Sequence, residues 1–188
     1  MSLTLRLSHG LLHFPMAWGA LPPVLLVHGG YHGASCWDEW RTVLAGLGLP
    51  SAALDLRGHG AMAGEGLSPT TGVGDYVVDV REAVSAIGEM ISQPPVLVGH
   101  SLGALVVLAA AAAGVPSAGL ALLAPSPPGN LPGVATVPEV PEGRLLPPPA
   151  EAVAIARWMG GLPHLRRCAS SGWPDFVLRT RFITAEAG

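Results

Sequence analysis

The stretch from Pro95 to Ala104, PVLVGHSLGA, decides the fold of this 188-residue chain. A short apolar run leads into the pattern Gly-x-Ser-x-Gly, and an alanine-rich segment follows at once. This order predicts a buried strand, a sharp turn with Ser101 at its tip, and then a helix. Such a turn is crowded, and Gly99 and Gly103 allow neighbouring backbone to come close to it.

Ser101 has two interpretations. In the first, the strained turn presents its hydroxyl to an open cleft, beside the N-terminal dipole of the next helix and the backbone N–H of Leu102. These groups stabilise negative charge on a substrate oxygen, which is the chemistry of acyl transfer. In the second, the serine merely caps the helix. The apolar run before the motif and the helix-forming residues after it favour the first interpretation.

The composition predicts an extensive core. Hydrophobic residues make up 49% of the chain and charged residues 12%, which suits a mostly parallel sheet whose strands are buried on both faces. The net charge of −3 gives no basic surface for nucleic acid, so we expect no nucleic-acid partner. All ten cationic residues are arginine, which excludes Schiff-base and P-loop lysine chemistry.

Neither a metal nor a membrane span is expected. Cys36 and Cys168 have no metal-ligand spacing and form no disulfide framework, so a cytoplasmic location is the default, and no cofactor is implied. The uncharged stretch Leu102–Ala124 is long enough to cross a membrane. Gly114–Ser117 interrupts it, however, and a buried helix followed by a buried strand explains it better.

The order of the remaining patterns predicts an α/β fold. A helix is expected to begin at Ser35 or Asp38, and a second at Asp75, with Asp79 on the surface of that second helix. The helix after the elbow is apolar all round and should be buried. Strands alternating with helices are typical of a parallel sheet with its ligand crevice at the strands' carboxyl ends. The expected strands cover residues 3–7, 12–14, 22–28, 52–56, 95–99 and 119–123.

The composition changes after the last of these strands. Residues 125–149 hold nine of the nineteen prolines and show no convincing periodicity. The sequence therefore predicts a core at residues 1–125, followed by a proline-rich linker and partial helical cap at residues 126–188.

Three motifs together resemble the α/β-hydrolase family, in particular its cap-bearing esterases, lipases and lyases. HGGY at residues 28–31, with ASCW at 34–37, resembles the oxyanion loop of that family. DLRGHG at residues 55–60 is similar to the loop after its fourth strand, and GHSLG at 99–103 to its nucleophile elbow. The motifs stand in the family's order and at its spacing.

The resemblance implies a fold and a set of site residues. The fold is a mostly parallel sheet with helices on both faces, ending after about the sixth strand and followed by a partial cap. Ser101 would be the nucleophile, and the backbone N–H groups of Gly30 and Leu102 the oxyanion donors. In the family's motifs, histidines such as His28 and His59 support the loops beside the site. The substrate would be a carboxylic ester or a similar small acyl compound.

The chain departs from the family pattern in its acid and base. In the family an acid and then a histidine follow the nucleophile along the chain. Here His164 is the one histidine after Ser101, and the candidate acid, Asp175, comes after it in reversed order. We therefore interpret both as cap residues and keep them only as candidate base and acid. The C-terminal part that carries the acid and the histidine is expected to be lacking.

Two further expectations follow from that interpretation. The strand Gly119–Leu123 would be an open apolar edge, through which the chain could associate with itself. The function would be serine-dependent ester hydrolysis, with two alternatives: a catalytically inactive fragment or binding module, and a cofactor-free lyase or oxidative enzyme. The sequence does not identify the small-molecule substrate.

Overall fold

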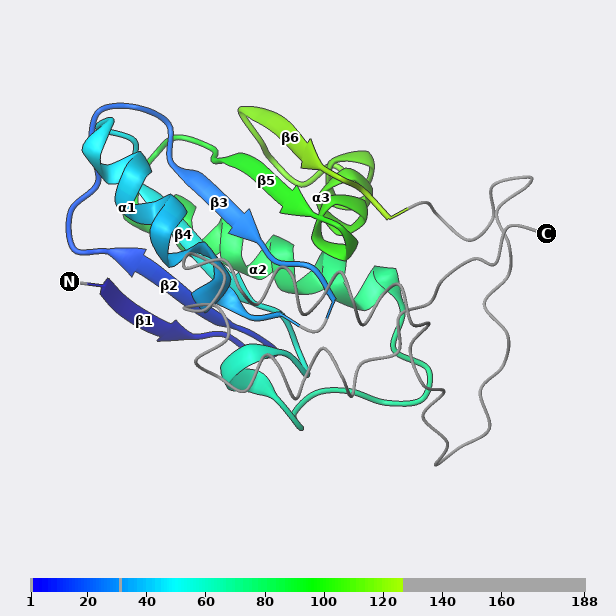
Figure 1. Cartoon of the computed structure of the whole chain (residues 1–188). Coiled ribbons are helices and arrows are strands. Elements are labelled where there is room, and N and C mark those ends of the chain that lie inside the picture. The colour runs from blue at the N-terminus through cyan, green and yellow to red at the C-terminus, as the bar shows by residue number, and fades with distance from the viewer. Residues whose placement is uncertain (1, 31, 127–188) are drawn as a thin grey trace. The chain divides into compact units, whose positions relative to one another are not determined.

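The computed structural model describes residues 2–30 and 32–126 of the chain. They form a six-stranded sheet in the order β1-β2-β4-β3-β5-β6 (Figure 1). The strands are β1 (Ser2–Arg6), β2 (Leu11–Pro15), β3 (Val24–Val27), β4 (Ser51–Asp55), β5 (Val96–His100) and β6 (Gly119–Leu123).

The register of the strands brings their ends together. β1 and β2 form a hairpin, and β2 pairs with β4 antiparallel, whereas β4, β3, β5 and β6 are parallel. Val27 lies opposite both Leu54 and Gly99, so β3, β4 and β5 end at the same level. The loops after these strands, which carry the three motifs, therefore meet at one edge of the sheet.

Helices cover both faces of the sheet, as expected. α1 (Asp38–Gly46) follows a short 3-10 turn at Ala34–Trp37 and lies on one face. α2 (Val73–Met90) and α3 (Leu102–Ala112) lie on the other face (Figure 1).

Alternate residues of each strand face the two sides and build two cores. Leu25 and Val27 of β3 pack in the cluster that α2 and α3 cover. Leu26, between them, packs in the cluster that contains Trp37. The central strand is therefore buried on both faces, which explains its continuous run of apolar residues.

α2 differs from the prediction in two respects. It begins two residues before Asp75, whose carboxylate instead accepts a hydrogen bond from the backbone N–H of Gly72 at 2.8 Å and so caps the helix from its first turn. The prediction that Asp79 lies on the helix surface is wrong, because Asp79 is fully buried. Its charge is paired with Arg57, which belongs to the loop after β4.

The uncharged stretch divides into a helix and a strand as predicted, with α3 ending at Ala112 and β6 beginning at Gly119. The prediction that both are buried is wrong, because β6 has no buried residue and Leu108 of α3 is 44% exposed. No helix in the described part of the chain is long and apolar enough to cross a membrane. Among the described strands β6 pairs with β5 alone, and Leu120 and Leu122 are 41% and 37% exposed. Self-association through this strand stays a prediction, as does the linker and cap at residues 126–188, since only residue 126 of that range is described.

Gly103→Ala should destabilise the fold, because the new Cβ atom would lie 2.3 Å from the carbonyl oxygen of Val27 and 2.4 Å from that of His28. Backbone cannot move aside as a flexible side chain can, so we expect a loss of at least about 3 kcal/mol in the free energy of unfolding.

Gly88→Ala in α2 is the matched control, since nothing lies within 4 Å of its added Cβ. This variant should gain roughly 0.5–1 kcal/mol from helix propensity. Urea titration measures both, and equal effects of the two substitutions would contradict the packing argument.

Candidate active site

Ser101 stands in the strained turn that its motif predicts. Its backbone has φ 52° and ψ −116°, a conformation that residues other than glycine rarely adopt. It occupies the N-cap position of α3, yet its side chain makes no capping hydrogen bond. The interpretation of this serine as a mere helix cap is therefore wrong.

The turn is held by close backbone contacts. A Cβ atom on Gly99 would lie 2.3 Å from the carbonyl oxygen of Gly103, and one on Gly103 would meet the end of β3. Leu123 at the end of β6 accepts a hydrogen bond from the N–H of Ser101 at 2.9 Å. Holding a residue in such a conformation costs about 1–3 kcal/mol, and these contacts stabilise the turn enough to offset that cost.

Gly30 and Leu102 lie side by side next to this turn. A Cβ atom added to Gly30 would be 3.8 Å from Cδ2 and 3.9 Å from Cβ of Leu102. The structure therefore brings together the loop after β3 and the first turn of α3.

His28 fixes the loop that carries Gly30. The side chain is fully buried, with Nδ1 2.7 Å from the carbonyl oxygen of Gly29 and Nε2 3.2 Å from the backbone nitrogen of Leu56. The neutral ring protonated on Nδ1 satisfies both contacts, because it donates to Gly29 and accepts from Leu56. Burial lowers the pKa of His28 to about 3, so the ring stays neutral. This histidine supports the loop, and both its nitrogens are occupied.

Asp55, at the end of β4, also holds the loop after β3 in place. Its carboxylate accepts hydrogen bonds from the backbone N–H of Ala34 at 2.6 Å and from Nε2 of His13 at 2.9 Å. No Cβ atom fits at Gly33 or Gly60, since each would lie within 2.8 Å of the Asp55 carboxylate. These two glycines thus allow the two loops to pack directly on this acid.

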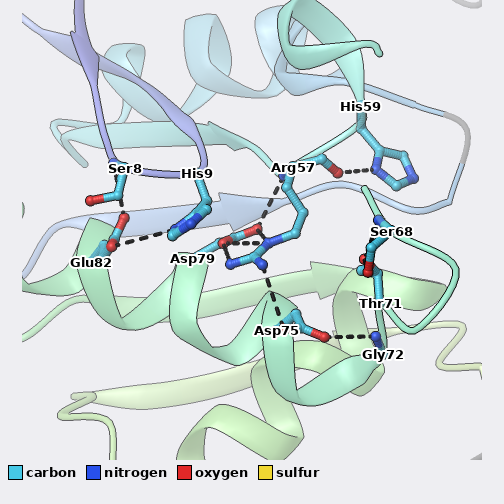
Figure 2. A network of polar contacts seen from close by, with 10 residues as sticks. All are labelled: Ser8, His9, Arg57, His59, Ser68, Thr71, Gly72, Asp75, Asp79 and Glu82. Carbon is cyan, nitrogen blue, oxygen red and sulfur yellow. Dashed lines mark hydrogen bonds and ion pairs between the residues drawn. The ribbon is translucent and has the colours of Figure 1, made fainter. Parts of the chain in front are cut away.

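Arg57 ties the loop after β4 to α2. Figure 2 shows its guanidinium between two acidic side chains of that helix, Asp79 and Asp75. Nη2 donates to Asp79 at 2.6 Å and Nε at 3.0 Å, while the backbone N–H of Arg57 also donates to this carboxylate at 3.1 Å. Hydrogen bonding to Asp79 raises the pKa of Arg57 above its ordinary value. The sequence marked Arg57 within its motif but gave no sign of its partner.

Two histidines that the sequence analysis did not single out also lie here. The rings of His32 and His100 stack with centroids 6.0 Å apart. A Cβ atom on Gly29 would be 3.0 Å from Nδ1 of His100 and 3.2 Å from Cβ of Ser101, so this pair adjoins the elbow. Burial lowers the pKa of His100 and, helped by the nearby His100 and His59, lowers that of His32 to about 4. In the sequence, His32 directly follows HGGY and His100 lies inside GHSLG, and these positions are the signal that could have marked them.

The candidate base His164 and candidate acid Asp175 lie outside the described residues. Within those residues no group of three histidine, cysteine or acidic side chains is arranged to hold a metal. A hollow of about 680 Å³ lies between β1, α1 and the start of β4, where Trp18 and Arg41 line it. That is the opposite end of the parallel strands from Ser101, so this hollow is not the site that the motifs form.

The comparisons with known proteins agree with this arrangement. A model of the alpha/beta hydrolase family matches residues 24–187. The chain belongs to the alpha/beta hydrolase family. Its mostly parallel sheet with helices on both faces is the fold expected of this α/β hydrolase.

The curated relatives of this α/β hydrolase include several esterases. Protein phosphatase methylesterase 1 of Mus musculus is 37% identical over 101 residues, which are 51% of this chain and 25% of that protein. Methyl jasmonate esterase 1 of Vitis vinifera is 35% identical over 79 residues, 42% of this chain and 29% of that protein. The chain thus spans between a quarter and a third of the length of these two relatives.

Solved structures show the same fold. The thioesterase domain from the curacin biosynthetic pathway superposes with a TM-score of 0.60 at 23% identity, covering 89% of this chain and 65% of that one. A hypothetical protein from Pseudomonas aeruginosa PAO1 superposes with a TM-score of 0.52 at 27% identity, covering 70% of this chain and 46% of that one.

His28→Gln should flatten the dependence of stability on pH. The folded pKa of His28 is about 3 and the unfolded one 6.5, so the unfolded state binds an extra proton between these values. Its contribution to stability is complete above pH 6.5 and is lost as the pH falls toward 3. Glutamine retains a donor and an acceptor without titrating. Between pH 6 and 4 the wild-type slope should exceed that of the variant by about 1.4 kcal/mol per pH unit, measured by urea unfolding. Parallel slopes would contradict the neutral buried ring.

Asp79→Ala should cost about 3 kcal/mol of unfolding free energy, because the buried Arg57 charge then keeps only its longer ion pair with Asp75, at 3.5 Å. Replacing both residues by leucine should recover most of that loss, since it removes the stranded charge. Glu89→Ala, at an exposed position of the same helix, is the control and should change stability by less than about 0.5 kcal/mol. A small loss of stability in Asp79→Ala alone would show that the Arg57–Asp79 pair does not hold the loop after β4 in place.

Proposed function

We propose that this chain is a serine hydrolase of carboxylic esters or similar small acyl compounds. In this proposal Ser101 is the nucleophile, and the backbone N–H groups of Gly30 and Leu102 are the oxyanion donors. The observation that supports it most is the Ser101 side chain itself, which sits in a strained turn and is not used to cap the helix.

The proposed reaction has two steps. Ser101 Oγ attacks the ester carbonyl carbon, gives up its proton to a base, and forms a tetrahedral intermediate whose oxyanion accepts hydrogen bonds from the two backbone donors. The alcohol leaves with a proton, and an acyl-serine remains. Water then attacks that acyl group, releasing the carboxylic acid and restoring the Ser101 hydroxyl. Each oxyanion donor would contribute about 3 kcal/mol to the transition state.

The mechanism needs a general base to take the proton of Ser101. The nitrogens of His28 are bonded to Gly29 and Leu56, and Nδ1 of His59 lies 2.8 Å from the carbonyl oxygen of Arg57. These contacts favour a supporting role for both rings. His164, with Asp175 as the acid, stays the candidate base in this proposal.

Small esters are the first substrates to test. One relative is named a protein phosphatase methylesterase and another a methyl jasmonate esterase. A methyl ester of a small carboxylic acid should therefore be tested together with the chromogenic ester p-nitrophenyl acetate. The two alternatives, an inactive binding module and a cofactor-free lyase or oxidative enzyme, predict that neither ester is hydrolysed through Ser101.

Ser101→Ala should abolish hydrolysis of p-nitrophenyl acetate, because the acyl group then has no acceptor. Loss of the nucleophile in comparable triads lowers the rate by about a million-fold, so the variant should match the uncatalysed background. Ser85→Ala, at an exposed position of α2, should hydrolyse the ester like wild type. Labelling by a fluorophosphonate should follow the same pattern. Equal rates for wild type and Ser101→Ala would overturn the proposed ester hydrolysis and leave the two alternatives.

A further inference from the structure

Residues 123–126, which are the last residue of β6 and the three that follow it, contact the elbow. The first contact is the carbonyl of Leu123, which accepts the N–H of Ser101 at 2.9 Å, and the second is the N–H of Ser126, which donates to the carbonyl of Ser101 at 3.1 Å. The third contact joins the side chains, since Oγ of Ser126 lies 3.2 Å from Oγ of Ser101. One short segment thus bonds the amide, the carbonyl and the hydroxyl of a single residue.

The backbone of this segment is bent to make these contacts. Ala124 has φ 43°. Ala124 and Ser101 are the two residues other than glycine with a positive φ in the described part of the chain. Pro125 follows, whose ring fixes its own φ, and the proline after Ser126 restricts Ser126 in turn. Ser126 therefore has few backbone conformations to lose when it meets the elbow, which favours a fixed contact over an incidental one.

We propose that Ser126 is a positioning residue for the nucleophile, an inference that rests on the proposed function. Its hydroxyl donates to Oγ of Ser101, holds that side chain in one rotamer and leaves the Ser101 proton free for transfer to the base. As the proton leaves, negative charge grows on Oγ, and a hydrogen bond to a charged acceptor is stronger than one to a neutral acceptor. Ser126 thus assists the attack without contacting the substrate.

Ser126→Ala removes the hydroxyl and keeps the backbone N–H that binds the elbow. For p-nitrophenyl acetate we expect kcat/KM, which reports the attack by Ser101, to fall about tenfold, as for the loss of one hydrogen bond. Fluorophosphonate labelling of Ser101 should slow by a similar factor. Ser126→Thr, which restores a hydroxyl, should recover most of the rate. Ser117→Ala, just before the other end of β6, is the control and should behave like wild type.

The outcomes separate this inference from the proposed function. If wild type hydrolyses the ester through Ser101 but Ser126→Ala keeps its full kcat/KM and labelling rate, the positioning role is overturned and the function stands. A fall in kcat/KM with an unchanged rate of fluorophosphonate labelling would also overturn it, since the reactivity of Ser101 would then not depend on Ser126.

A double-mutant cycle tests the contact without any activity. Ser101→Ala, Ser126→Ala and the double variant are unfolded in urea. A bonded pair should give a coupling of about two- to tenfold in the unfolding equilibrium constant. Additive effects would overturn the inference even if the chain hydrolyses no ester.

Discussion

The close approach of α3 to the end of β3 is the constraint on which the rest of the site depends. Gly103 lies against the carbonyl oxygens of Val27 and His28 so closely that a single methyl group would not fit. This contact sets where α3 begins, and therefore where the strand before it must turn. Ser101 occupies that turn, so its strained conformation follows from packing between backbone segments.

Buried polar groups then fix the loops around the turn. His28 joins the ends of β3 and β4, Asp55 accepts from the loop after β3, and Arg57 links the loop after β4 to α2. Each uses a side chain to satisfy backbone groups that a loop cannot pair by itself. Both loops are thereby tied to the sheet or to a helix that covers it, which is the support that a preorganised site requires.

The fold was predictable because its signals are local. Apolar runs that lead into glycine motifs predict β3, β4 and β5. Val77, Val80 and Val84 recur three and four residues apart, which predicts the helix α2. The prediction for Asp79 is wrong because the helix pattern shows that this position is polar, but does not show that its side chain pairs with Arg57, a buried arginine from another loop. Ser126 was missed because a serine between prolines has the pattern of a linker. The chain reaches Ser101 through the positive φ of Ala124, and an alanine in the sequence does not indicate such a conformation. For the base, the order of His164 and Asp175 offers no familiar pattern, and both lie outside the described residues.

The contacts that locate Ser101 are made almost entirely by main-chain atoms, from Leu123, Gly103 and the end of β3. Main-chain atoms are the same whatever side chain a neighbouring residue carries. The side chains around Ser101 are therefore free to change without moving it. If Ser101 is the nucleophile that we propose, a scaffold of this kind separates the geometry of the reaction from the choice of substrate, which makes the loop positions around it suitable for exchange when a new specificity is sought.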